Sequence, residues 1–309
     1  MTHSHHFLQS TAWETFQQSL GRTTFRRSGD GWDFLAILEP GTANSRLYCP
    51  YGPTVAGRTA LTAAIAELTQ LGQSQRVSFL RIEPVDPTYN AFLSSHKWRK
   101  VTYQQLQPEH SHLLDLTQPK EQLIAQMAQP VRNIYRNYHK KGVVVHHSTN
   151  PKDIEILLQF VHQVAQRNGI RPHHDNYFRQ QAATLFPLHA AQLWYATFEG
   201  QPIAAALFYQ TETTLYYAHA GASALPQHRK LNAGTAVLAE AIIDAQQRGL
   251  QLVDLYGIAP AGASPDHPWA GFTKFKRSFG GSDVTFAGAW DLPLRPVSYW
   301  LYRAYQTIR

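Results

Sequence analysis

The sequence has a single cysteine, Cys49, among its 309 residues. One cysteine excludes an intramolecular disulfide and a cysteine-based zinc site, and it is typical of a reducing compartment. No run of about 18 consecutive apolar residues occurs, and the first residues lack the apolar stretch of a signal peptide. These absences predict a soluble, cytoplasmic protein without a transmembrane segment.

Charged residues are scarce, at 16% of the chain, which excludes a disordered polyelectrolyte tail. Lysine and arginine number 28 against 21 acidic residues, so the net charge is 28 − 21 = +7. Three windows without any acid hold ten of the basic residues: Lys97, Arg99 and Lys100; Arg132, Arg136, Lys140 and Lys141; Lys274, Lys276 and Arg277. Without them 18 basic residues face 21 acidic ones, so the positive charge is local.

Patterns for metal or serine chemistry are also missing. The 16 histidines include no His-Glu-x-x-His motif, and the cluster from His173 to Asp175 lacks the spacing of a ligand set. No Gly-x-Ser-x-Gly nucleophile elbow is present. We therefore expect neither a metal site nor a serine triad.

The length fits two modules, and hydrophobic periodicity predicts an α/β pattern in each. In the first third we expect a helix that Gly72 ends and three strands. Their ranges are Thr59–Leu71 for the helix, and Trp32–Leu38, Arg46–Cys49 and Val77–Ile82 for the strands. The order strand, strand, helix, strand is typical of an α/β module.

The remaining chain predicts a second α/β module with a mixed sheet. We expect Thr117 to cap a helix, Pro130 to divide two helices, and Gly142 to end the second. Further helices are expected from about Pro151 and over Ala233–Arg248. The expected strands are Val143–His147, Gln192–Glu199, Ile203–Gln210, Thr213–Ala220, Leu252–Tyr256 and Val284–Trp290, and a last helix is expected over Val297–Ile308.

The second basic window has helical spacing, because Arg132, Arg136 and Lys140 fall at i, i+4 and i+8. On a helix these residues form one cationic stripe, which is either a solvated face or a track for phosphates of a nucleic acid or nucleotide-linked substrate. Tyr135 and Tyr138 lie among them and could stack on bases or pack into the core.

The third basic window lies in the stretch from Phe275 to Gly281, where aromatic residues flank Lys276 and Arg277 and a glycine pair follows. Such a stretch can hold a lysine in a cleft, with its ammonium group facing a developing oxyanion. The alternative is a basic surface loop with a glycine turn.

Several stretches together resemble the FemABX family of aminoacyl-tRNA-dependent peptidoglycan bridge-forming transferases. They occur in the family's order over nearly the whole chain: FLQSTAWETFQ from Phe7, LYCPYGP from Leu47, FLRIEP from Phe79, LDLTQPKEQLIAQM from Leu114, VRNIYRNYHKKGVVV from Val131, GQPIAAALFY from Gly200, YYAHAGAS from Tyr216, DLYGIAP from Asp254 and GFTKFKRSFGG from Gly271. This resemblance implies two modules like those of GNAT acyltransferases with a cleft between them, without the helical arm of some members. It places residues 1–110 plus 290–309 in the first domain and residues 111–289 in the second.

The resemblance also implies a reaction, in which an amino acid passes from its tRNA ester to the side-chain amine at the third position of a peptidoglycan stem peptide. The acceptor is lipid II or a UDP-MurNAc-peptide. Lys276 matches the lysine of the family's Phe-Lys motif, which stabilises the tetrahedral intermediate, and Phe275 shapes the pocket for the tRNA end. Aminoacyl-tRNA is then a co-substrate, and no bound cofactor is expected. The chain is expected to be a monomer with peripheral contact to the inner membrane face.

Other site residues follow from the same resemblance. Arg171, Tyr177, Tyr217 and Tyr256 match positions that hold the phosphates and sugar of the precursor, although a capping arginine and core tyrosines are the alternative. The tRNA phosphates are assigned to the basic windows: Arg132, Arg136, Lys140, Lys141, Lys274 and Arg277. Many relatives have a lysine after the first tryptophan, but here Trp13 is followed by Gln17 and Gln18, with Arg22 or Arg26 as substitutes.

Two other functions remain open. A CoA-dependent GNAT acyltransferase needs a glycine-rich loop at a helix start, and here Asn232 replaces its first glycine while Gly234 remains. A non-catalytic RNA-binding protein could use the stripe of Arg132, but this function leaves Lys276 without a role.

Overall fold

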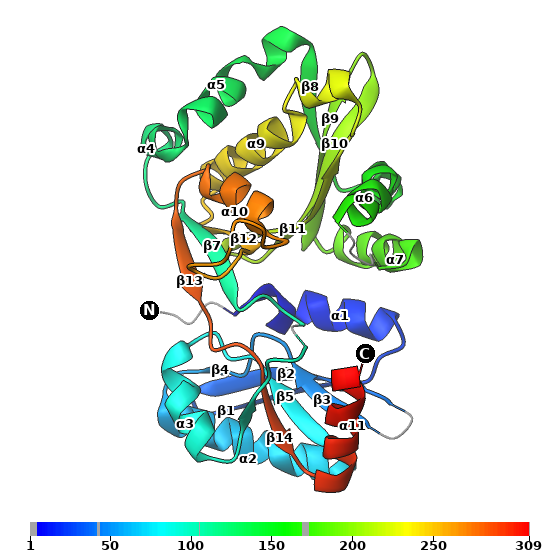
Figure 1. The fold of residues 1–309 in the computed structure, drawn as a ribbon, viewed down its shortest axis with the longest axis vertical. Helices are drawn as coiled ribbons and strands as arrows, with labels where there is room; N and C mark the ends of the chain where they lie inside the picture. Colours follow the sequence, from blue (N-terminus) through cyan, green and yellow to red (C-terminus); the bar gives the residue numbers. More distant parts are fainter. Residues whose placement is uncertain (1–4, 42–43, 105, 169–172, 309) are drawn as a thin grey trace. The chain divides into compact units, whose positions relative to one another are not determined.

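The computed structural model describes residues 5–41, 44–104, 106–168 and 173–308. The chain forms two compact units: Met1–Glu109 with Thr285–Arg309, and His110–Val284. Each unit has its own β-sheet (Figure 1). Among the described residues, no helix combines the length and the apolar character needed to cross a bilayer.

The first unit is built on a sheet in the order β1-β2-β3-β5-β14-β6, with β4 paired to β2. Its strands are β1 (Thr24–Gly29), β2 (Trp32–Glu39), β3 (Arg46–Cys49), β4 (Thr54–Val55), β5 (Phe79–Ile82), β6 (Arg99–Lys100) and β14 (Trp290–Pro293). Its helices are η1 (Phe7–Gln9), α1 (Thr11–Ser19), α2 (Arg58–Ser74), η2 (Pro87–Tyr89), α3 (Asn90–Ser95) and α11 (Pro296–Ile308). The end of the chain thus completes this sheet, because β14 lies between β5 and β6.

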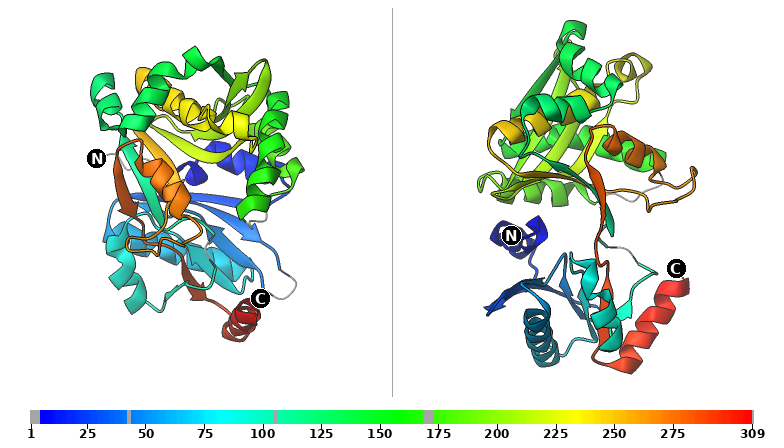
Figure 2. Two further views of the ribbon diagram at one scale, coloured as in Figure 1. Left: turned by 45° about the horizontal axis from the view of Figure 1, so that its top comes forward. Right: turned by 90° about the vertical axis from the view of Figure 1, so that its left-hand side faces the viewer.

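Alternate residues of β5 face opposite sides of this sheet, as the pleat requires. Leu80 and Ile82 enter the core that α2 covers on one face (Figure 2). Phe79 lies on the other side, where its ring contacts Tyr299 and Tyr302 of α11 at centroid distances of 5.3 and 5.0 Å. The sheet of the first unit is therefore packed on both faces.

A buried ion pair joins β5 to β14. Arg81 Nε and Nη2 donate to the two carboxylate oxygens of Asp291 at 2.7 and 2.8 Å, and both side chains are 0% exposed. Tyr103 and Tyr299 also donate their hydroxyl groups to Asp291. The fork of the guanidinium group satisfies both carboxylate oxygens, which is what makes such a buried pair tolerable.

The second unit has a sheet in the order β13-β7-β12-β11-β10-β9-β8. Its strands are β7 (His110–Asp115), β8 (Val143–Ser148), β9 (Ala191–Phe198), β10 (Gln201–Gln210), β11 (Thr214–Ala222), β12 (Leu252–Gly257) and β13 (Ser282–Thr285). Its helices are α4 (Lys120–Gln126), α5 (Gln129–Asn137), η3 (Tyr138–Lys141), η4 (Pro151–Asp153), α6 (Ile154–Asn168), α7 (Asp175–Leu185), α8 (Pro226–Arg229), α9 (Ala233–Gln247) and α10 (Ala270–Arg277).

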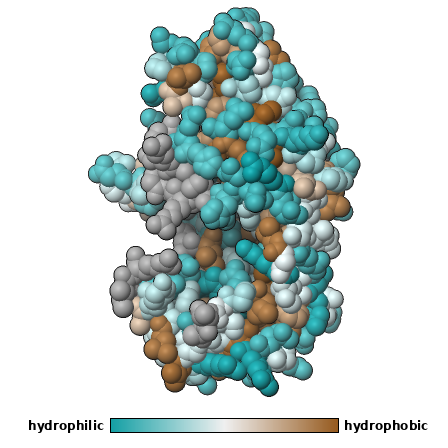
Figure 3. Space-filling model, turned by 90° about the vertical axis from the view of Figure 1, so that its right-hand side faces the viewer, coloured by the Kyte–Doolittle hydropathy of each residue, from teal (hydrophilic) through white to brown (hydrophobic). Residues whose placement is uncertain are grey.

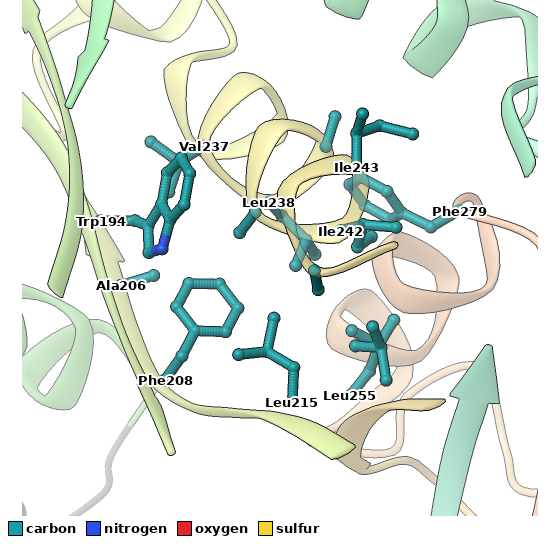
Figure 4. Close-up of a cluster of buried hydrophobic side chains, with 14 of the residues drawn as sticks. Trp194, Ala206, Phe208, Leu215, Val237, Leu238, Ile242, Ile243, Leu255 and Phe279 are labelled. Carbon is teal, nitrogen blue, oxygen red and sulfur yellow. The ribbon is translucent and has the colours of Figure 1, made fainter. Parts of the chain in front are cut away.

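Helix α9 forms the centre of the second core. It lies on one face of the sheet, and α6 and α7 cover the other face (Figure 1). The many alanines of α9 allow the helix to approach the strands closely, while its larger residues fill the core between the helix and the sheet. Figure 4 shows this packing for Val237, Leu238, Ile242 and Ile243 of α9 against Trp194, Phe208, Leu215, Leu255 and Phe279.

Three local predictions were wrong. Thr117 does not cap a helix, because its N–H and hydroxyl both donate to Asp115 and α4 begins later, at Lys120. Gly72 does not end α2, which continues to Ser74. The single strand expected over Val284–Trp290 is in fact two strands, β13 and β14, in different sheets, with Gly288 at φ 68° between them.

Candidate active site

The pairing between β11 and β12 ends before either strand does. These parallel neighbours pair only from Thr214 to Tyr216 with Leu252 to Asp254, although β11 continues to Ala222 and β12 to Gly257. The other neighbour of β12, strand β7, also shows a register shift between Asp254 and Gly257. The end of β12 is therefore an irregular stretch in the middle of the sheet, a feature common next to active sites.

Tyr256 has a left-handed backbone within this stretch, at φ 59°. This conformation is strained for a bulky residue, so the surrounding structure must hold it. Asp254 does so, because its Oδ1 accepts a hydrogen bond from the Tyr256 N–H at 2.7 Å and another from the Ser111 hydroxyl. The buried carboxylate of Asp254 thus holds the backbone at Tyr256, directly before Gly257.

Lys276 reaches this point from helix α10. Its Nζ donates to the carbonyl oxygen of Gly257 at 2.6 Å, and its side chain is half-buried. Burial lowers the pKa of Lys276 to about 8, an effect that the negative charge of Asp254 opposes. The site therefore holds an ammonium group that is partly removed from water. Its pKa lies closer to neutral pH than that of an ordinary lysine.

The charge of Asp254 depends on the same neighbours. Burial raises the pKa of Asp254, whereas the hydrogen bonds from Ser111 and the Tyr256 N–H and the charge of Lys276 lower it. The buried carboxylate accepts two hydrogen bonds and faces a cation. These partners offset the cost of burying its negative charge.

The start of α10 is anchored to the chain that follows β12. The Thr273 hydroxyl group accepts a hydrogen bond from the Ala259 N–H at 2.8 Å, and its O–H donates to the Trp269 carbonyl oxygen. Thr273 is buried, so this link between α10 and the end of β12 is shielded from water.

The end of α10 is held against α4 and β7 through the glycine pair. Gly280 and Gly281 have φ values of 85° and 90°, and a Cβ at Gly281 would overlap the Leu113 carbonyl oxygen. The buried His112 ring lies between Asp283 Oδ1 and the Gly280 carbonyl oxygen, 2.6 Å from each. These contacts fix the position of Lys276 relative to β12.

The third basic window, predicted either to hold a lysine in a cleft or to form a surface loop, lies on helix α10. Its three cations have different surroundings. Lys276 faces the end of β12, whereas Lys274 is exposed and Arg277 pairs with Asp283 at 2.5 Å. Phe275 packs against the second core, with its ring 5.1 Å from Phe279.

Three of the four residues matched to precursor binding lie on different elements, and the fourth is outside the described residues. Tyr256 is next to Gly257, and Tyr217 of β11 packs on Phe208 with its centroid at 5.4 Å. Tyr177 lies on α7, where its ring stacks on His173 at 4.1 Å. Arg171 lies outside the described residues.

The cationic stripe does not lie on one continuous α-helix. Helix α5 ends at Asn137, and Lys140 and Lys141 belong to the 3₁₀ helix η3. Arg132 donates to the carbonyl groups of Ala125 and Met127 at the end of α4, whereas Arg136 is exposed.

The two tyrosines near this stripe serve the core of the second unit. Tyr135 and Tyr138 pack against it, and the Tyr138 hydroxyl donates to Glu240 at 2.8 Å. Of the two alternatives for these rings, the structure therefore favours packing.

Sequence reasoning missed Asp254, Ser111 and His112 as site residues. Asp254 was visible within the stretch DLYGIAP, but its partner Ser111 lies 143 positions earlier on β7. No local spacing connects residues that only strand pairing brings together.

Comparisons with known proteins show what this arrangement is similar to. Residues 190–307 match the family model described as the FemAB family. A structure described as FemX matches with a TM-score of 0.84 and 14% identity over 95% of this chain and 94% of that chain. No curated protein matches the sequence.

Two further structures share the fold. The C-terminal domain of a putative lysylphosphatidylglycerol synthetase from Agrobacterium fabrum has a TM-score of 0.63 and 10% identity, over 97% of this chain and 93% of that chain. A tandem GNAT protein from the clavulanic acid biosynthesis pathway has a TM-score of 0.55 and 15% identity, over 94% of this chain and 90% of that chain.

The predicted fold class is confirmed, since the chain has two mixed α/β sheets and matches both FemX and a tandem GNAT protein in fold. The predicted resemblance is confirmed over residues 190–307, a segment that contains both the end of β12 and helix α10. The part of the chain that matches the FemAB family model, residues 190–307, includes Asp254, Tyr256 and Lys276.

Proposed function

We propose that this protein transfers an amino acid from aminoacyl-tRNA to the side-chain amine at the third residue of a peptidoglycan stem peptide. The observation that carries the proposal is the Lys276 ammonium group, half-buried and hydrogen-bonded to Gly257 at the end of β12. A cation held in this way is suited to stabilise negative charge that develops on a carbonyl oxygen.

The reaction needs positioning and charge stabilisation rather than a nucleophilic side chain. The acceptor amine attacks the ester carbonyl, a C–N bond forms, and the C–O bond to the tRNA ribose breaks. The amine loses a proton and the ribose oxygen gains one. Lys276 stabilises the oxyanion of the tetrahedral intermediate, and Phe275 beside it supports the wall against which the tRNA end lies.

The remaining residues are assigned to the two substrates. Tyr177, Tyr217, Tyr256 and Arg171 contact the precursor, which is lipid II or a UDP-MurNAc-peptide. The exposed cations contact tRNA phosphates: Arg136, Lys140, Lys141 and Lys274. Arg132 and Arg277 have protein partners that a phosphate must displace before they contribute. Because aminoacyl-tRNA is the donor, this function implies a cytoplasmic location.

The proposed function is tested by incubating the protein with a panel of charged tRNAs and each of the two precursors, and by measuring the mass of the precursor afterwards. We expect the mass of one amino-acid residue to be added from at least one aminoacyl-tRNA, and none from acetyl-CoA. Addition of an acetyl group and no amino acid would show a CoA-dependent acyltransferase. Binding of tRNA without any adduct would show an RNA-binding protein.

The pH dependence of transfer should report the protonation of Lys276. Its pKa is lowered to about 8, so the rate should fall as the pH rises above that value. Asp254→Asn removes the negative charge that raises this pKa, so the falling limb should move to lower pH. Single-turnover rates measured between about pH 6 and about pH 9.5 would show the shift.

The matched control is Asp244→Asn, which removes an aspartate of the same unit that pairs with Arg248 on the surface of α9. Its pH profile should overlay that of the wild type. If the Asp254 and Asp244 variants have the same falling limb, Asp254 does not set the protonation of Lys276.

A further inference from the structure

Helix α11 carries an exposed apolar stripe. Val297, Trp300, Leu301 and Tyr305 are 76%, 49%, 64% and 57% exposed. Within the described part of the chain, these four are most of the large hydrophobic residues that are exposed; the others are Val144, Leu188 and Leu225. So much exposed apolar surface on one helix marks a binding surface. We call these four residues the α11 stripe.

The spacing of the stripe places it on one side of the helix, because residues 297, 300, 301 and 305 lie within about 140° at 100° per residue. The opposite side holds the helix on its own unit. There the Tyr299 hydroxyl donates to Asp291, the Tyr302 hydroxyl donates to Gln104, and Arg303 lies over the Tyr103 ring at 4.1 Å. Helix α11 therefore turns its more polar side inward and its apolar side outward, the reverse of an ordinary surface helix.

Positive charge accompanies the stripe. The Arg99 guanidinium lies 4.9 Å from the centre of the Trp300 ring, and Arg295 directly precedes the helix. Both arginines are exposed, and neither has a carboxylate partner among the described residues. Helix α11 contains no acidic residue, and Asp291, which faces Arg99 across the strand pair, is buried. In Figure 1 helix α11 lies on the right-hand side of the first unit, and Figure 3 shows this side. Hydrophobic surface is visible there on the first unit.

We propose that the α11 stripe, with Arg99 and Arg295, binds the surface of an anionic lipid bilayer. Tryptophan and tyrosine favour the boundary between headgroups and acyl chains, Val297 and Leu301 can enter the apolar layer, and the arginines can pair with lipid phosphates. The 13 residues of α11 span only about 20 Å, so the helix lies along the surface rather than across the bilayer. This surface lies outside the lysine site and does not depend on the proposed transfer reaction.

The experiment is flotation of the full-length protein with vesicles, compared between phosphatidylglycerol–phosphatidylcholine mixtures and pure phosphatidylcholine. We expect the wild type to bind the anionic vesicles and salt to weaken this binding. Leu301→Glu and, separately, Val297→Glu should each weaken it by about tenfold or more, because a charge enters the apolar contact. Arg99→Gln should weaken it by about fivefold and leave any binding to neutral vesicles unchanged.

The matched control is Leu225→Glu, since Leu225 is 50% exposed but lies in the second unit. It should bind anionic vesicles like the wild type, and equal thermal melting of all variants shows that they are folded. The proposal is overturned if the wild type does not float with anionic vesicles, or if the α11 variants bind as well as the Leu225 variant. A dimer that Leu301→Glu dissociates, with unchanged vesicle binding, would show instead that the stripe joins two copies of this chain.

Discussion

Replacing Lys276 with methionine should lower the rate of amino-acid transfer by about 10²- to 10³-fold, the usual loss when one oxyanion donor is removed. Methionine keeps the length and apolar body of the side chain, so it fills the same space beside Gly257. It removes the ammonium group and the hydrogen bond to the Gly257 carbonyl oxygen. The affinity for precursor and tRNA should change much less than the rate, because the lost interaction forms in the transition state.

Lys274→Met is the matched control, because Lys274 lies on the same helix but is exposed. It removes the same charge and should weaken tRNA binding at most slightly. Single-turnover transfer, together with separate binding measurements for tRNA and precursor, distinguishes the two effects. Equal rates for the Lys276 and Lys274 variants would show that Lys276 does not stabilise the oxyanion.

Asp291→Ala should lower the free energy of unfolding by about 3–5 kcal/mol. The substitution leaves the Arg81 guanidinium buried without its carboxylate partner, and it also removes the acceptor for Tyr103 and Tyr299. Because Tyr299 belongs to α11, part of the loss should appear as detachment of this helix from the first unit.

Urea unfolding of the variant and of Asp30→Ala measures this effect, since Asp30 lies in an exposed turn of the same unit. The control should change stability by about 0.5 kcal/mol or less. A double variant, Arg81→Met with Asp291→Leu, should recover much of the loss, because it removes both charges and keeps the volume. If Asp291→Ala is as stable as Asp30→Ala, the ion pair contributes nothing to the fold.

Regular elements were predicted well where a strong local pattern exists. The strands β9, β10 and β11 follow from apolar runs separated by short turns, and α9 follows from a long apolar segment that ends before Gly249. Helix α10 was not predicted, because it has only eight residues and begins beside Gly271, so its periodicity is too short to detect. The strands β1 and β7 were missed because polar residues interrupt their patterns.

Two α/β modules, the family resemblance and Lys276 as a candidate site residue could be inferred from the order of residues along the chain. The folded chain was needed to show which cation of α10 faces inward, which partners Asp254 has, and which side of α11 is exposed. Pairing in a sheet joins residues as distant as Ser111 and Asp254, and helix rotation separates neighbours such as Lys274 and Lys276. Both depend on packing across the whole unit, which local periodicity does not specify.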